Sequence, residues 1–152
     1  MLNLKPYSPL TAGVIINLSM GLLYGWSVLL APLEVSLDSD RASVSLAYSL
    51  ATIFFTIGMF VMYKLLNWLS LDKLALAMGA LGATGLALAG LEESIFTLII
   101  GFGAGYGFAA GVSYFIAISA ASHPSPIPIT IAMSINVSAF AVGGVLWPPI
   151  FE

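Results

Sequence analysis

The chain has 152 residues, of which 60% are hydrophobic and only 7% are charged. Soluble chains are on average about 25% charged, so 4 basic and 7 acidic side chains are too few to cover the surface of a water-soluble fold of this length. The net charge of −3 argues against a nucleic-acid partner, and the absence of cysteine excludes disulfides, thiolate metal sites and cysteine nucleophiles.

Long charge-free runs predict five transmembrane helices. A helix needs about 20 apolar residues to cross roughly 30 Å of hydrocarbon. Runs of this kind cover about residues 10–33, 43–66, 74–91, 95–119 and 127–151, and the segment Ser122-His123-Pro124-Ser125-Pro126 separates the last two. We therefore expect an all-α membrane protein in which residues 1–152 form a single transmembrane helical domain.

The basic residues predict the orientation, because lysine and arginine favour cytoplasmic loops. A cytoplasmic N-terminus places Lys5, Lys64 and Lys73 inside and only Arg41 outside. We expect this orientation, in a plasma or inner membrane, with the lipid bilayer as the surrounding partner. The first apolar run is long and has no clean small-residue cleavage site, so no signal peptide is expected.

Glycines recur at close spacing inside several of the expected helices. Gly21 and Gly25 are four residues apart in the first, and Gly103, Gly107 and Gly111 follow the same spacing in the fourth. Close contact between helices in lipid relies on such small residues. The pattern indicates helix packing, and it leaves open whether the fourth helix also slides or bends.

Catalytic and metal-binding patterns are missing. The single histidine, His123, lies in an expected loop, with no carboxylate near it in sequence and no cysteine or second histidine to complete a metal site. We expect neither an enzyme nor a cofactor.

Polar residues inside membrane spans usually face protein or a cavity. On the second expected helix, Ser45, Tyr48, Ser49, Thr52 and Thr56 fall within about 100° of one another. The first, fourth and fifth helices also have a polar side, whereas the third is almost entirely leucine, alanine and glycine. The alternative for each serine or threonine is a hydrogen bond back to its own helix.

Several segments resemble the major facilitator superfamily, in particular its oxalate/formate antiporter and monocarboxylate transporter branch. The segment Gly21-Leu-Leu-Tyr24-Gly-Trp26-Ser27-Val-Leu-Leu-Ala-Pro32-Leu33 is similar to the first helix of that family, and Ser43-Val-Ser-Leu-Ala-Tyr48-Ser49 to the start of the second. Gly101-Phe-Gly-Ala-Gly105-Tyr-Gly107 resembles its glycine-rich fourth helix, and Ala141-Val-Gly143-Gly144-Val-Leu-Trp-Pro148-Pro149-Ile-Phe the end of its fifth.

The chain also departs from that family. Where the family has a charged Gly-x-x-x-Asp-Arg-x-Gly-x-Arg loop, this chain has Tyr63, Asn67, Trp68, Ser70 and Asp72. The family has twelve helices in two halves, whereas about five are expected here. The basic residues that bind anions in this branch generally lie in the second half.

The resemblance implies a partial secondary transporter that moves a small organic anion, such as a monocarboxylate or dicarboxylate, by alternating access. Helices 1, 2, 4 and 5 would line the path, with helix 3 outside. The path candidates are Asn17, Tyr24, Tyr48, Thr52, Tyr106, Tyr114 and Asn136. Asn136 is the weakest of them, because it lies off the serine and threonine face of its helix.

Two other classes remain open. The chain could be a truncated relic that does not transport, or a small membrane accessory or assembly subunit. A complete path would need self-association as a homo-oligomer or a missing second half.

Overall fold

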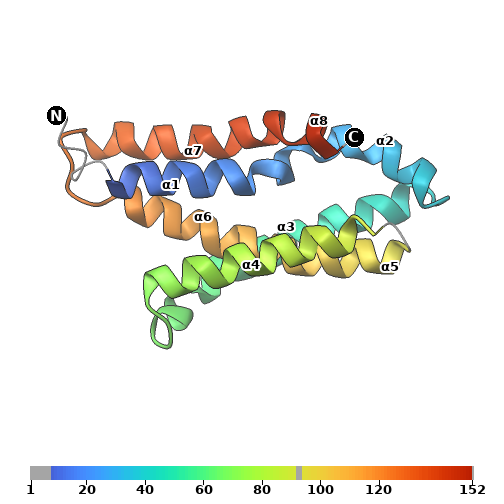
Figure 1. Cartoon of the computed structure of the whole chain (residues 1–152), viewed down its shortest axis with the longest axis horizontal. Coiled ribbons are helices and arrows are strands. Elements are labelled where there is room, and N and C mark those ends of the chain that lie inside the picture. Colours follow the sequence, from blue (N-terminus) through green and yellow to red (C-terminus); the bar gives the residue numbers. More distant parts are fainter. Residues whose placement is uncertain (1–7, 92–93, 152) are drawn as a thin grey trace.

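Five helices long and apolar enough to cross a membrane dominate the computed structural model, which describes residues 8–91 and 94–151 (Figure 1). The five spans are Ser8–Ser36, Arg41–Leu66, Leu71–Ala89, Ile95–Ala121 and Ile129–Leu146. This confirms the expected all-α bundle of five transmembrane helices and makes the chain an integral membrane protein.

Three spans are single α-helices: α3 (Arg41–Leu66), α4 (Leu71–Ala89) and α7 (Ile129–Leu146). The fifth predicted run continues to residue 151, but α7 ends at Leu146 and a short helix α8 (Pro148–Phe151) follows. Trp147 keeps helical dihedral angles (φ −78°, ψ −40°), but Pro148 and Pro149 have no backbone N–H to donate to the carbonyls of residues 144 and 145, which explains the break.

The first and fourth spans are irregular near their middles. The first consists of α1 (Ser8–Met20), a 3-10 segment η2 (Gly21–Gly25) and α2 (Trp26–Ser36). The fourth consists of α5 (Ile95–Leu98), a π-helical segment η3 (Ile99–Tyr106) and α6 (Gly107–Ala121). Both irregular segments coincide with glycine-rich sequence, and sequence patterns alone did not predict either change of helix type.

Local hydrogen bonds explain where α3 begins. The Asp40 carboxylate accepts hydrogen bonds from the backbone N–H groups of Ala42 (3.0 Å) and Ser43 (3.1 Å), and from the Ser43 hydroxyl (2.6 Å). An N-cap of this kind satisfies N–H groups that have no partner within the helix. These bonds, that of the Ser43 side chain above all, lower the pKa of Asp40.

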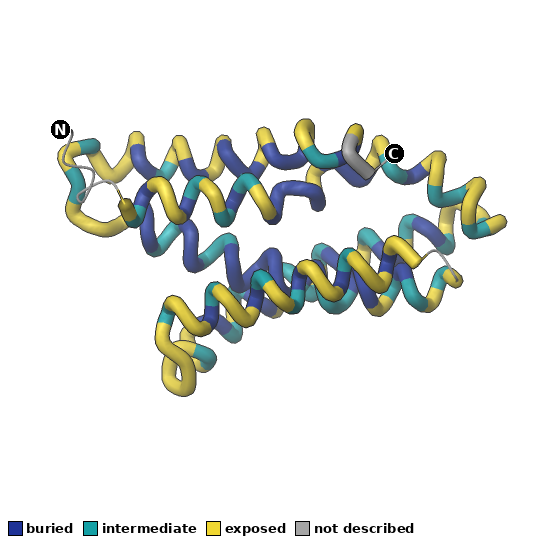
Figure 2. The backbone as a smooth tube through the Cα atoms, viewed as in Figure 1, coloured by how far each residue is buried: buried dark blue, intermediate teal, exposed yellow. Residues whose placement is uncertain are grey.

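The fourth span is the centre of the bundle. Figure 1 shows α6 crossing between a layer formed by α1 and α7 and a layer formed by α3 and α4. The fourth span packs against α1, α3, α4 and α7, whereas α4 packs mainly against the fourth span. Figure 2 shows that α6 is buried along most of its length, while α4 and α7 each expose one side.

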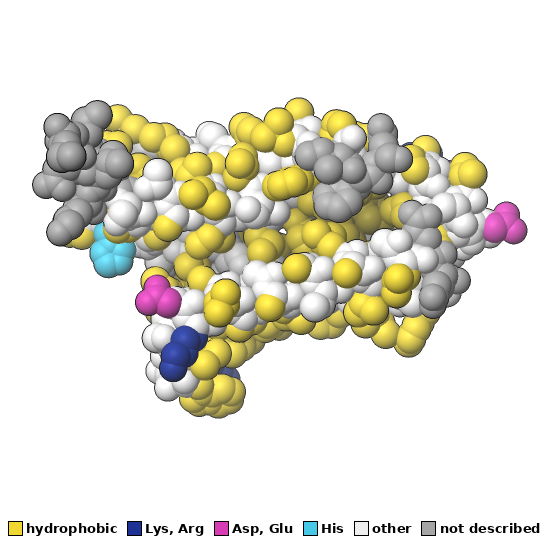
Figure 3. Space-filling view, viewed as in Figure 1, with side chains coloured by type: hydrophobic (Ala, Val, Ile, Leu, Met, Phe, Trp, Pro, Cys, Tyr) yellow, Lys and Arg dark blue, Asp and Glu magenta, His cyan; other side chains and the backbone are white. Residues whose placement is uncertain are grey.

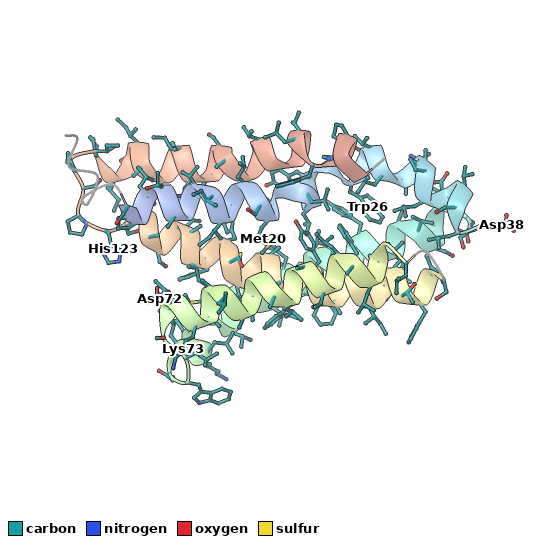
Figure 4. All side chains as sticks on the ribbon, viewed as in Figure 1. Met20, Trp26, Asp38, Asp72, Lys73 and His123 are labelled. Carbon is teal, nitrogen blue, oxygen red and sulfur yellow. The ribbon has the colours of Figure 1, made fainter. Side chains whose placement is uncertain are left out.

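The charged side chains that the structure describes lie at the two ends of the bundle. Glu34, Asp38, Asp40 and Arg41 surround the turn between α2 and α3. Figure 3 shows acidic side chains towards both ends of the face in view, and Figure 4 shows Asp38 at one end and Asp72, Lys73 and His123 towards the other. Charges at the ends and long uncharged helices between them are the arrangement that a bilayer requires.

Candidate functional site

The irregular segment η2 lies in backbone contact with α7. A Cβ atom at Gly21 would overlap the carbonyl oxygen of Phe140 and lie 2.7 Å from the Cα atom of Gly143. One turn further, a Cβ atom at Gly25 would lie 2.5 Å from the carbonyl oxygen of Gly144. Both positions therefore require glycine, and the close approach fixes the middle of the first span against α7.

Two side chains from neighbouring segments bind backbone carbonyls beside this irregular segment. The Trp147 indole N–H donates to the carbonyl of Leu18 at 2.7 Å, and the Tyr106 hydroxyl donates to the carbonyl of Met20 at 2.7 Å. Where a helix changes type inside a membrane, its released carbonyls need such partners because lipid supplies none. Tyr106 is 1% exposed, so it lies inside the bundle and supports the irregular segment of the first span.

A buried amide pair joins α1 to α7. The Asn17 amide nitrogen donates to the backbone carbonyl of Asn136 at 2.9 Å and to its side-chain oxygen at 3.0 Å. Both residues are fully buried. Gly13 makes room for the pair, because a Cβ atom there would lie 2.8 Å from the Asn136 amide nitrogen. Asn17 and Asn136 thus hold two helices together and do not face an open surface.

Four aromatic side chains from four different spans form one half-open surface, which we call the aromatic face: Tyr24, Phe55, Tyr114 and Phe140. Phe140 lies at its centre, with ring centroids 5.1 Å from Tyr24, 5.2 Å from Tyr114 and 6.0 Å from Phe55. Tyr24 is 64% exposed and Phe140 is buried beneath it. The third span, α4, contributes none of the four rings.

Tyr48 and Thr52 extend the same side of α3, since residues 48, 52 and 55 fall on one helical face. Tyr48 stacks on Trp26 with ring centroids 5.7 Å apart. The Thr52 hydroxyl donates to the carbonyl of Ser49 at 2.8 Å, and Ser49 and Thr56 make equivalent bonds within α3. The hydroxyl groups of Ser49, Thr52 and Thr56 therefore donate within their own helix.

The three glycines of the fourth span position α3. Gly103, Gly107 and Gly111 lie against Ala47, Ala51 and Phe55, which repeat at the same spacing on α3. A Cβ atom at Gly107 would lie 2.5 Å from the Ala51 carbonyl oxygen and 2.7 Å from its Cα atom. This contact sets the distance between the helices that carry Phe55 and Tyr114, whose rings are 5.6 Å apart.

Besides the aromatic face, the structure has an apolar hollow beside the first span. Figure 3 shows an apolar hollow between α2 and α4, and Figure 4 shows Trp26 pointing into it. Its volume is about 100 Å³, and its lining includes Leu22, Trp26, Leu86 and Phe102. Apart from the Trp26 indole N–H, the lining side chains have no hydrogen-bonding group, so the hollow offers a polar solute few partners.

The aromatic face is therefore the better candidate for contact with a polar solute, because it combines ring surfaces with tyrosine hydroxyls that can donate and accept hydrogen bonds. In the described parts of the chain, no group of three or more histidine, aspartate or glutamate side chains is placed to hold a metal ion. The sequence matches no protein-family model and no curated protein.

The seven path candidates thus fall into two groups. Tyr24, Tyr48, Thr52 and Tyr114 lie on or beside the aromatic face, whereas Asn17, Tyr106 and Asn136 are buried between helices. Sequence reasoning missed Phe55, Phe140 and Trp147. Nothing in the pattern of apolar residues separated these three from the other core aromatics.

Proposed function

We propose that this chain forms one wall of a secondary transporter of the major facilitator type, which moves a small organic anion by alternating access. The observation that carries the proposal is the aromatic face, to which the first, second, fourth and fifth spans each contribute a ring. The third span packs against the fourth and contributes no ring, as a peripheral helix would.

The chemistry of the aromatic face supports a carboxylate solute. Tyr24 is largely exposed although it lies near the middle of the first span. A hydrogen bond from its hydroxyl group to a polar partner would stabilise the side chain in that position. Tyrosine hydroxyls can donate hydrogen bonds to a carboxylate or to its bound water. The interrupted first span adds support, because broken helices near the middle of the membrane are common at transporter binding sites.

A wall on one side does not enclose a solute, so the proposed transporter needs a second half or a second copy of this chain. The aromatic face carries no cationic side chain, and the positive charge that binds the anion would come from that second element. In the orientation proposed from the lysines, the turn between α3 and α4 lies in the cytoplasm.

A membrane accessory subunit is the second candidate. The exposed ring of Tyr24 would then lie against a helix of a partner protein, with no water between them. The two functions differ in whether water reaches the aromatic face.

Single cysteines can test this difference, because the chain has none of its own. Cysteine replaces Tyr24, Thr52 or Tyr114 one at a time, and Ala80, an exposed residue in the middle of α4, provides the lipid-facing control. In native membranes, a water-soluble anionic thiol reagent is expected to label the three positions at least tenfold faster than position 80. Slow labelling at all four positions would contradict the transporter and favour the accessory subunit.

A further inference from the structure

We propose that the turn between α3 and α4 is a docking surface for anionic phospholipid headgroups. The residues that form it, the lysine–tryptophan turn, are Lys64, Trp68 and Lys73. The inference uses neither the aromatic face nor the proposed transport activity, so each can fail without the other.

The aromatic side chains around this turn point away from the protein core. Trp68 is 82% exposed, and Phe60 and Tyr63 on the last turns of α3 are exposed as well. An exposed tryptophan just beyond the end of a membrane span is typical of the interface, where its ring lies at the level of the headgroups. The other two tryptophans differ, since Trp26 is buried and Trp147 is half-buried and donates a hydrogen bond to Leu18.

Lysines flank this tryptophan on both sides. Lys64 lies in the last turn of α3 and Lys73 in the first turn of α4, and both are exposed. Neither has an ion-pair partner among the described residues. Lysine stems can run along apolar helix surface while the ammonium group reaches the headgroups, and the exposed side chains of Phe60 and Leu76 supply such surface one turn away.

The charge on this turn favours an anionic headgroup. Asp72 is the one acidic residue from Lys64 to Lys73, and Figure 4 shows its side chain diverging from that of Lys73. Asp72 also lies in the first turn of α4, where the helix N-terminus stabilises its negative charge. At the other end of the bundle, Arg41 lies 3.8 Å from Glu34 and is surrounded by acidic residues. Within residues 8–91 and 94–151, the lysine–tryptophan turn is the one place that combines unpaired cations with an interfacial ring.

Trp68 itself provides the test. The purified chain is placed in phosphatidylcholine vesicles that contain increasing fractions of brominated phosphatidylglycerol, or of brominated phosphatidylcholine as the reference. The Trp68→Phe variant reports the fluorescence of the two other tryptophans. Subtracting its signal from that of the parent gives the quenching of Trp68 alone. We expect phosphatidylglycerol to associate with this turn more strongly than phosphatidylcholine.

In the double variant Lys64→Gln/Lys73→Gln, the preference for phosphatidylglycerol over phosphatidylcholine is expected to fall by about fivefold for each lysine removed. In the parent, added salt is expected to weaken the same preference. The control Arg41→Gln removes one positive charge at the opposite end and should keep the preference. Equal quenching of the parent by the two lipids would overturn the proposal. It would also be overturned if Arg41→Gln lost as much preference as the double lysine variant.

Discussion

Replacement of Gly107 with alanine is expected to lower the free energy of unfolding by about 1–3 kcal/mol. The added methyl group would lie 2.5 Å from the Ala51 carbonyl oxygen, 2.7 Å from its Cα atom and 3.0 Å from its carbonyl carbon. All three contacts are with backbone, which cannot rotate away as a side chain can, so α3 must move away from the fourth span. Thermal unfolding in detergent measures the loss.

Gly79→Ala is the matched control. Gly79 lies on α4, and a Cβ atom there has no neighbour within 4 Å. The same substitution should therefore be neutral or stabilising there, by up to about 1 kcal/mol, because alanine favours the helix more than glycine does. A Gly107→Ala variant as stable as the Gly79→Ala variant would show that α3 does not pack on this ridge of glycines.

Tyr106→Phe is expected to loosen the middle of the first span. The variant keeps the ring that stacks on Phe102 at 5.3 Å but removes the hydroxyl that donates to the Met20 carbonyl. A buried carbonyl that loses its donor costs about 1–3 kcal/mol, with the lower end of that range typical in membranes. Faster hydrogen exchange at the backbone amides of residues 21–25, measured by mass spectrometry, would report the effect locally.

Tyr63→Phe is the control for this variant. Tyr63 also packs its ring on a phenylalanine, Phe115 at 5.3 Å, but its side chain is largely exposed near the end of α3. Loss of that hydroxyl should leave exchange in η2 unchanged. If the two variants exchange alike at residues 21–25, the Tyr106 hydroxyl does not support the irregular segment.

The sequence predicts the spans well because the bilayer imposes a simple rule on length and charge. Any run of about 20 apolar residues without a charge predicts a transmembrane helix. The turns at residues 37–40 and 67–70 contain the polar and charged residues that end such runs. The irregular segments η2 and η3 are different. Both are glycine-rich and apolar, as regular membrane helices are, and the change of helix type depends on contacts with other spans.

The direction of each polar side chain was harder to predict than its presence. Tyr106 and Tyr114 belong to the same helical span, yet Tyr106 donates to Met20 inside the bundle whereas Tyr114 packs on the aromatic face. Asn136 carried one usable signal, because it lies off the serine and threonine stripe of its helix. The stripe consists of Thr130, Ser134 and Ser138, which are exposed on α7, whereas Asn136 lies on another side and bonds to Asn17.

The measurement that tests the transport proposal most directly is protection of a single cysteine by an organic anion. Thr52→Cys in native membranes is labelled with a water-soluble thiol reagent in the presence of increasing oxalate, formate or lactate, with sucrose as the inert control. The proposal predicts that at least one of these anions slows labelling in a saturable manner, while sucrose has no effect. Labelling at an unchanged rate under all three anions, at position 52 and also at positions 24 and 114, would contradict it.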